Sequence, residues 1–243
     1  SWEKSVRSYR TEEDTDIIIT GSNSKMLSSE LSTLIGGRYH EIYVQSLSYQ
    51  EFLLFHELED NDDALSKYIN YGGLPGLKQV GLDDEEFVWD YIRAVFHTVM
   101  LKDIVERNNI RNVSFLNTLL RYFADTIGKL SSLNNISKFM KSQGLDVSVK
   151  SIAAYLDYFR DAYLLLTVNR FDIHGKKLLE SNEKIYFGDV GLRNLIAGGE
   201  RQGDIEKILE NIVYQQLVRM GYAVSVGQLR ASEVDFVCTK SNE

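Results

Sequence analysis

The sequence predicts a mixed α/β protein in which helices predominate. Near the start, a β-branched apolar run at 16–20 is followed by a helical pattern and then by an alternating segment at 39–44, which is the order of an α/β unit. Further on, apolar residues recur every three or four positions over long stretches, the spacing of amphipathic helices. The predicted fold class is therefore α/β joined to a mostly α part.

Length and composition limit the classes of protein that the chain resembles. Its 243 residues (27.8 kDa) carry 27 Lys and Arg against 35 Asp and Glu, a formal net charge of -8. The single cysteine excludes a disulfide framework and a multi-cysteine zinc site, and it fits a cytoplasmic location. No apolar run approaches the roughly 18 residues that a membrane span needs, so we expect no membrane partner. The charged start shows no secretory signal.

The first unit of the chain has the pattern of a strand, a helix and a strand. The isoleucines at 17–19 form a continuous β-branched run, which suits a strand buried on both faces of a parallel sheet. A helix is expected from about 24 to 34, ended by the glycine pair at 36–37. The alternation at 39–44 predicts the second strand.

Helices are expected over most of the next part. A helix follows Ser48 and reaches about residue 55, and a short helix is expected at 65–70. The segment Tyr71-Gly72-Gly73-Leu74-Pro75-Gly76 then interrupts the helical pattern with the single proline of the chain. Apolar residues at helical spacing predict one long helix over about 83–108.

Residues 113–184 have the order of a winged helix-turn-helix. Three helical segments, of which the third has Ser148 as its N-cap, are followed by two strands around a turn at His174-Gly175. Three helices followed by a hairpin are the winged variant of the helix-turn-helix. Beyond the glycines at 198 and 199, the pattern predicts a helix over 205–220 and strands at 222–226 and 233–237.

Short segments in a fixed order carry a family resemblance over essentially the whole chain. They are Ile18-Ile19-Thr20-Gly21-Ser22-Asn23-Ser24, Leu34 to Gly37-Arg38, Leu47-Ser48-Tyr49-Gln50-Glu51-Phe52, Tyr71-Gly72-Gly73-Leu74-Pro75, Leu101-Lys102-Asp103-Ile104, Ile136-Ser137-Lys138-Phe139, Tyr186-Phe187-Gly188-Asp189-Val190-Gly191-Leu192-Arg193, Leu209-Glu210-Asn211 and Glu233-Val234-Asp235-Phe236. Together they resemble the AAA-superfamily ATPases of bacteria and archaea that carry a C-terminal domain of unknown function.

The resemblance implies four units. They are the C-terminal part of an AAA-type P-loop ATPase core at 1–56, a helical lid at 57–108, a winged-helix domain at 109–197 and the start of a restriction-endonuclease-like α/β domain at 198–243. The chain has no G-x-x-x-x-G-K-[ST] loop to hold phosphates and no apolar strand ending in Asp-Glu. We therefore expect a fragment without Walker A and Walker B motifs that does not hydrolyse ATP by itself. The full-length protein would bind ATP and Mg²⁺.

The resemblance also implies nucleotide-site residues. Ser22 and Asn23 would sense the γ-phosphate and orient the attacking water, and Arg38 would act as an arginine finger. Gly73 and Pro75 would bring a lid loop close to bound nucleotide. Each position also has a local explanation: Gly-Ser-Asn is common turn chemistry, Arg38 follows a helix end, and the glycines and the proline break a helix.

The predicted winged helix is a candidate DNA-binding unit. Residues 129–184 carry nine Lys and Arg against six Asp and Glu, while the chain as a whole is acidic. Lys150 in the third helix, with Lys176 and Lys177 in the wing, would meet phosphates. Winged helices also serve as protein contacts, so another protein is the alternative partner.

Glu210 and Asp235 resemble the start of a nuclease site. A helix Glu and a strand Asp would hold Mg²⁺, which activates water for phosphodiester cleavage. A complete site also needs a Glu-x-Lys on a further strand. Tyr186–Asp189 ends an apolar strand with an acid, but no phosphate loop precedes it, so we do not assign it a Walker B role. The leading hypothesis is thus a regulatory AAA-type ATPase; the alternatives are a DNA-binding or Mg²⁺-dependent DNA-cleaving protein and a non-catalytic protein-interaction scaffold.

Overall fold

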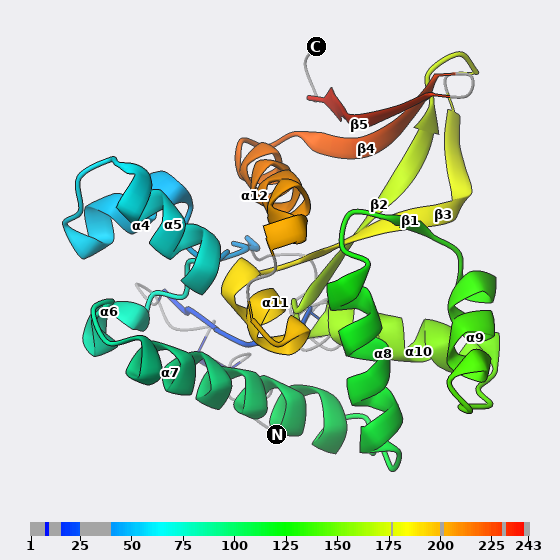
Figure 1. Cartoon of the computed structure of the whole chain (residues 1–243), viewed down its shortest axis with the longest axis horizontal. Coiled ribbons are helices and arrows are strands. Elements are labelled where there is room, and N and C mark those ends of the chain that lie inside the picture. Colours follow the sequence, from blue (N-terminus) through cyan, green and yellow to red (C-terminus); the bar gives the residue numbers. More distant parts are fainter. Residues whose placement is uncertain are drawn as a thin grey trace.

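Helices pack beside and below one mixed five-stranded sheet in the computed structural model (Figure 1). The structure describes residues 8–9, 16–24, 40–175, 177–199, 202–229 and 232–240. In chain order the elements are α4 (Tyr49–His56), α5 (Asp62–Tyr71), α6 (Leu77–Val80), α7 (Glu85–Thr98), η1 (Val99–Glu106), α8 (Val113–Asp125), β1 (Leu130–Ser131), α9 (Leu133–Ser142), α10 (Val149–Asp161), β2 (Leu165–Asp172), β3 (Lys177–Phe187), α11 (Val190–Ala197), η2 (Gln202–Asp204), α12 (Ile205–Arg219), β4 (Ala223–Leu229) and β5 (Ser232–Thr239). The α/β class is confirmed.

Polar residues at the helix starts explain where most helices begin. Ser48 and Glu51 form a capping box at α4: the Ser48 hydroxyl accepts from the Glu51 amide at 3.3 Å, and the Glu51 carboxylate accepts from the Ser48 amide at 2.7 Å. Ser148 accepts from the Ser151 amide at 3.1 Å and starts α10, as its N-cap position predicts. These bonds satisfy amides that have no partner within the helix.

The long helix predicted over 83–108 exists, but its second half is not an α-helix. α7 continues without a break into η1, which is a π-helix of 8 residues. π-Helical segments are rare, usually short, and frequent at functional sites. The apolar spacing used for the prediction does not distinguish the two helix types, because both turn one face toward the core.

One sheet joins the third and fourth predicted units. Its strand order is β1-β3-β2-β4-β5, with β2 antiparallel to β3 and β4 antiparallel to β5. β2 and β4 pair in parallel, with Arg170 opposite Val226 and Asp172 opposite Gln228. The predicted boundary between 197 and 198 is therefore crossed by sheet hydrogen bonds, and the four-unit division stays a prediction.

The prediction of two strands near the start of the chain is wrong. No strand is assigned to residues 16–20 or 40–44. Ile18 is 88% exposed and Val44 is 83% exposed, so the apolar run is not buried either. A strand needs a neighbour to accept and donate its backbone hydrogen bonds, and no strand among the described residues pairs with these segments. The helix predicted over 24–34 lies, apart from Ser24, outside the described residues.

None of the helices in the described part of the chain is long and apolar enough to cross a membrane. The interior is built instead from aromatic and aliphatic side chains of the helices and of β2 and β3. Phe123 and Phe159, from α8 and α10, meet edge to face with ring centroids 6.3 Å apart. This contact fixes two helices of the predicted winged-helix unit against each other.

A buried carboxylate joins the Gly72-Gly73 loop to the start of α11. Asp189 is the N-cap of α11, where it accepts from the Leu192 amide at 3.1 Å, and it also accepts from the Gly73 amide at 2.8 Å. Burial raises the pKa of the Asp189 carboxyl, while hydrogen bonds from the Gly73, Leu192 and Gly191 amides act in the opposite direction. The loop and the helix are therefore held at hydrogen-bonding distance.

A buried arginine and the asparagine that follows it connect α11 with three other elements. The Arg193 guanidinium donates to the Ala124 carbonyl of α8 at 3.0 and 2.8 Å and to the Asp204 carboxylate at 2.6 Å. Asn194 donates to the carbonyls of Ile69 and Asn70 in α5 at 2.9 and 3.0 Å. Consecutive residues of one short helix thus fix the positions of α5, α8 and the start of α12 (Figure 1).

The Gly72 junction generates the first prediction. A Cβ at Gly72 would overlap Asp189 Oδ1 and lie 2.6 Å from the Gly191 amide nitrogen, whereas a Cβ at Gly81 would meet nothing within 4 Å. Both glycines occupy the same backbone region, with φ of 74° and 83°. Gly81→Ala should therefore cost only the backbone strain, about 1–3 kcal/mol. Gly72→Ala should cost about 1–3 kcal/mol more, because the buried carboxylate has to move.

Urea unfolding of both variants, followed by circular dichroism, measures the difference. Equal losses in the two variants would show that the Gly72–Asp189 contact is not tight.

Candidate functional site

Three carboxylates from two elements converge on one lysine of β3. The Lys184 ammonium lies 2.7 Å from Glu210 of α12, 2.8 Å from Glu233 of β5 and 3.2 Å from Asp235 of β5. The side chain of Lys184 is 2% exposed, while that of Asp235 is 65% exposed. The cluster is therefore a buried cation whose partners reach the surface on one side.

Aromatic rings form the floor of this cluster. The Tyr186 hydroxyl donates to Glu210, and its ring stacks on Tyr214 with centroids 4.6 Å apart. Phe236 lies against both rings, at 6.2 and 6.3 Å. Burial and the neighbouring Glu210 carboxylate both raise the pKa of Tyr186, so the phenol stays protonated and remains a donor.

The electrostatics keep Lys184 charged. Burial lowers the pKa of Lys184, but hydrogen bonds and charge interactions with Glu210 and Glu233 outweigh it and raise the pKa above the usual lysine value. A lysine that stays protonated is neither a general base nor a nucleophile. One ammonium against three carboxylates leaves the cluster negative, so it favours cations on its open side.

The predicted Mg²⁺ ligands are brought together, but around an ammonium ion. Glu210 and Asp235 both contact Lys184, which occupies the space between them. Within the described residues, no group of three His, Cys, Asp or Glu side chains has the geometry to hold a metal ion. A Mg²⁺ ion at this place would have to displace Lys184, and the assignment of Mg²⁺ to Glu210 and Asp235 stays a prediction.

The residues predicted to sense the γ-phosphate lie against the helices. The Ser22 hydroxyl donates to Asp103 of η1 at 2.9 Å, and Asn23 is 1% exposed. The hydroxyl of Ser24 donates to Asp161 at the end of α10 at 3.1 Å. Arg38, the predicted arginine finger, lies outside the described residues. Ser22 and Asn23 thus belong to a short segment anchored on two different helices.

The predicted lid loop at 71–76 packs closely against other parts of the protein, and not against an open space that could hold a nucleotide. The Gly73 amide is occupied by Asp189, and the Gly73 carbonyl accepts from the Leu47 amide at 2.7 Å. A Cβ at Gly73 would overlap the Leu47 carbonyl. Pro75, two residues later, is exposed. Packing explains the glycine, and nucleotide contact by Gly73 and Pro75 stays a prediction.

The basic residues predicted to contact DNA are only partly described. Lys150 is exposed in the first turn of α10. Lys176 lies outside the described residues, and Lys177 begins β3. The Gly128-Lys129 pair lies between α8 and β1, so it follows a helix, whereas a phosphate-binding loop connects a strand to a helix.

The roles of two buried charged residues, Lys184 and Asp189, were not predicted from the sequence. Lys184 lies two positions before Tyr186, on the same face of β3, beside the apolar end Ile185-Tyr186-Phe187 of the strand; a charge beside such an apolar end is a signal for a buried ion pair. The strand pattern before Asp189 suggested only a metal-binding role, which was set aside. Its place directly before the apolar helix Val190–Ala197 is an N-cap signal that identifies its structural role.

The lysine cluster generates the second prediction. Lys184→Met removes the cation and leaves three carboxylates facing one another, so it should lower the free energy of unfolding by about 3 kcal/mol. Millimolar Mg²⁺ should restore part of this loss, because three carboxylates without their ammonium attract a divalent cation even though they do not form a complete set of metal ligands. The matched control is Lys67→Met: Lys67 pairs with an exposed Asp63, 3.1 Å away, so it should change stability by about 1 kcal/mol or less.

Thermal unfolding with and without MgCl2 measures both effects. If MgCl2 does not raise the unfolding temperature of Lys184→Met, the three carboxylates do not lie close together as the structure shows. Equal Mg²⁺ stabilisation of the unchanged chain would instead show that Lys184 does not block a metal.

Comparison with known proteins gives two family matches and two similar proteins. The sequence model of an AAA domain matches residues 1–53, and that of a domain of unknown function (DUF8612) matches residues 62–203. An uncharacterized protein of Haemophilus influenzae is 36% identical over 246 residues, covering 100% of this chain and 60% of the relative. An uncharacterized protein of Methanocaldococcus jannaschii is 29% identical over 259 residues, covering 100% of this chain and 57% of the relative.

The matches differ in how much of each protein they cover. The chain spans no more than 60% of the length of these relatives. No solved structure matches the chain. The match to the domain of unknown function extends from α5 into the start of η2 and takes in α11 with its buried Asp189 and Arg193. Because it spans more than half of the 243 residues, the chain belongs to the DUF8612 family.

Proposed function

We propose that the whole protein is an AAA-type ATPase in which ATP hydrolysis moves the part of the chain that follows residue 53. The observation that carries this proposal is the AAA-domain match over residues 1–53. ATP and Mg²⁺ are the cofactors, and the phosphate-binding motifs belong to parts of the protein that this chain does not contain. In this proposal Ser22, Asn23 and Arg38 stabilise or sense the γ-phosphate.

Contacts between the AAA-matched segment and the rest of the chain support a mechanical link. Ser22 and Ser24 bond to η1 and α10, and the ring of Tyr43 lies 4.9 Å from that of Tyr163, just after α10. The Ser46 hydroxyl donates to the Gly188 carbonyl at 3.0 Å. Arg219 of α12 donates to the Ser46 carbonyl at 2.7 Å. A displacement of this segment would therefore act on η1, on the end of α10, on the connection between β3 and α11, and on α12.

The hydrogen bond from Ser22 to Asp103 suggests how ATP hydrolysis could change the contact between the AAA-matched segment and η1. A hydroxyl donates one hydrogen bond at a time, so Ser22 donates either to Asp103 or to a phosphate oxygen. Exchange between these acceptors would release or restore the contact with η1. Gly73 and Pro75 would then form the edge of the lid, with Gly73 fixed on Asp189.

The proposal predicts ATP binding and hydrolysis by the full-length protein, and no hydrolysis by the 243-residue chain. Asn23→Ala in the full-length protein should lower kcat by roughly tenfold to a hundredfold and leave ATP binding intact, because a misplaced water slows only the chemical step. Asn134→Ala, an exposed position in α9, is the matched control and should leave kcat unchanged.

Phosphate release and equilibrium binding of a fluorescent ATP analogue measure the two quantities. Full-length protein that binds no nucleotide sinks the proposal and favours a non-catalytic interaction scaffold.

A second candidate function, DNA binding, is favoured by the order of the elements after residue 112. We infer that α8, β1, α9, α10 and the β2–β3 hairpin form a winged helix, with α10 as its recognition helix. The supporting observation is the sheet order β1-β3-β2, in which a short strand between the first two helices pairs with the hairpin. Lys150, Lys176 and Lys177 are the proposed phosphate contacts. Mg²⁺-dependent cleavage at Glu210 and Asp235 would additionally require Lys184 to leave the cluster.

DNA binding by this unit should weaken as salt rises. Each phosphate contact contributes about 0.9 to the slope of log affinity against log salt concentration, so Lys150→Gln should reduce the slope by about that amount. Lys102→Gln is the control, because Lys102 is exposed on η1 outside the proposed unit. This variant should leave the slope unchanged. Fluorescence anisotropy with labelled duplex DNA at several salt concentrations gives the slopes. An unchanged slope in Lys150→Gln, or binding that ignores salt, contradicts this candidate.

A further inference from the structure

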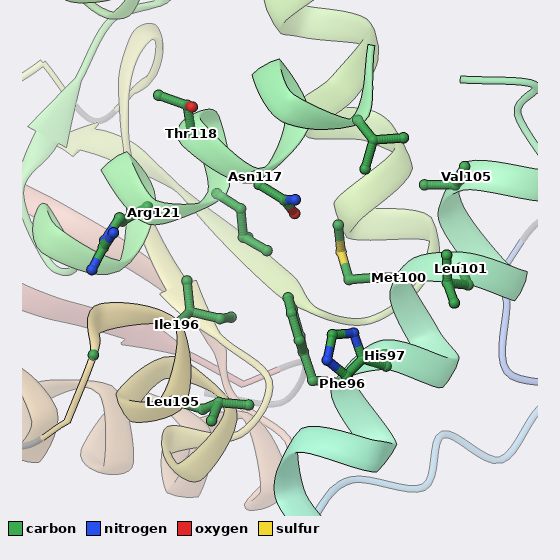
Figure 2. A pocket seen from close by; sticks show the side chains of 13 residues that line it. Phe96, His97, Met100, Leu101, Val105, Asn117, Thr118, Arg121, Leu195 and Ile196 are labelled. Atoms are coloured by element: carbon green, nitrogen blue, oxygen red, sulfur yellow. The ribbon is translucent and has the colours of Figure 1, made fainter. Parts of the chain in front are cut away.

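A cavity of about 410 Å³ lies between α7–η1, α8 and the end of α11 (Figure 2). Figure 2 shows Asn117, Thr118 and Arg121 of α8 on one side, Phe96, Met100 and Leu101 on the other, and Leu195 and Ile196 of α11 closing one end. The volume is in the range of about 300–1,000 Å³ that is typical of small-molecule sites. None of these side chains takes part in the lysine cluster or in the nucleotide and DNA contacts proposed above.

The walls of the cavity are apolar and partly open. Met100 is buried, whereas Leu101, one residue later in η1, is 52% exposed although it lines the cavity. Both belong to the π-helical segment, whose unusual geometry is rare and often marks functional sites. Leu101 lines the cavity and is still exposed to water. An apolar ligand that covers such a side chain removes apolar surface from water, which makes binding more favourable.

The polar groups of the cavity are basic or neutral. The lining contains Arg121 and His97 but no Asp or Glu, in a chain with a net charge of -8. The Arg121 guanidinium lies beside Gly198, the C-cap of α11, where a Cβ would come within 3.3 Å of it. The negative end of the α11 dipole favours a cation there. Arg121 forms no ion pair with a described residue, so its donors remain available to a ligand.

We propose that this cavity binds a small amphipathic anion, an apolar chain that ends in a carboxylate. The guanidinium of Arg121 offers two parallel donors to the carboxylate, which is the preferred geometry of this pair. Met100, Leu101 and Ile196 cover the apolar chain.

The charge and the shape of the proposed site make separate predictions. Octanoate should bind the 243-residue chain, and neutral octanol and cationic octylammonium should bind at least about tenfold more weakly, because only the carboxylate gains the charged hydrogen bonds. Arg121→Gln should weaken octanoate by about tenfold or more and leave octanol unchanged. Arg111→Gln removes an exposed arginine outside the cavity lining and should leave octanoate affinity unchanged.

Filling the cavity tests its shape. Asn117 is exposed on α8 and lines the cavity, so Asn117→Trp adds volume there without replacing a core residue. This variant should keep its circular dichroism spectrum and lose binding of octanoate.

Isothermal titration calorimetry gives the affinities, and amide chemical shifts in nuclear magnetic resonance spectra locate the binding. Saturable octanoate binding that shifts the amides of η1, α8 and α11 supports the proposal. Equal affinity for octanoate and octanol, or an unchanged affinity in Arg121→Gln, overturns the carboxylate site. Binding that does not saturate, or that survives Asn117→Trp, overturns the cavity as its location.

Discussion

The buried carboxylate of Asp189 is the interaction on which the arrangement of the helices depends. It accepts from the first turn of α11 and from Gly73, which lies more than one hundred residues earlier in the chain. A buried carboxylate without such donors is costly, so the amides and the carboxylate have to stay together in the folded chain. Gly72 and Gly191 carry no side chain where the two backbones cross, since a Cβ on either would overlap the other segment. Gly72 is therefore explained by this crossing, and Gly73 by its close approach to the Leu47 backbone.

Further buried charges extend from this point in both directions along the chain. Lys184, five residues before Asp189, is neutralised by α12 and β5, and Arg193, four residues after it, is neutralised by Asp204 at the start of α12. Each charge needs a partner from a different element, because removing one partner leaves the other buried and uncompensated. Satisfying all three at once fixes α11 and α12 relative to the sheet. The Lys184 cluster is therefore part of this framework, and its role as a metal site stays a prediction.

The sequence predicted local elements well and long-range partners poorly. Ser48 and Ser148 identified helix starts because capping depends on neighbouring residues alone. The run at 17–19 was predicted to be a buried strand, yet Ile18 is exposed, because strand formation depends on a pairing partner that local pattern does not reveal. The same limit applies to the candidate site. Glu210 and Asp235 were expected to share a Mg²⁺ ion, whereas in the structure both contact Lys184, which comes from β3 and which no spacing rule connects to them.

η1 lies between the cavity and the AAA-matched segment and contacts both. Its Met100 and Leu101 line the cavity, whereas its Asp103 accepts from Ser22 in the AAA-matched segment. Under the two proposals, a ligand that prefers one position of η1 would act on the Ser22 contact, and a nucleotide that draws Ser22 away from Asp103 would act on the cavity. Linkage requires these two effects to be equal as binding free energies: if the ligand changes nucleotide affinity by some factor, the nucleotide changes ligand affinity by the same factor. A π-helix suits this position, because its backbone hydrogen bonds differ from those of α7 and a change between the two helix types shifts the side chains that follow.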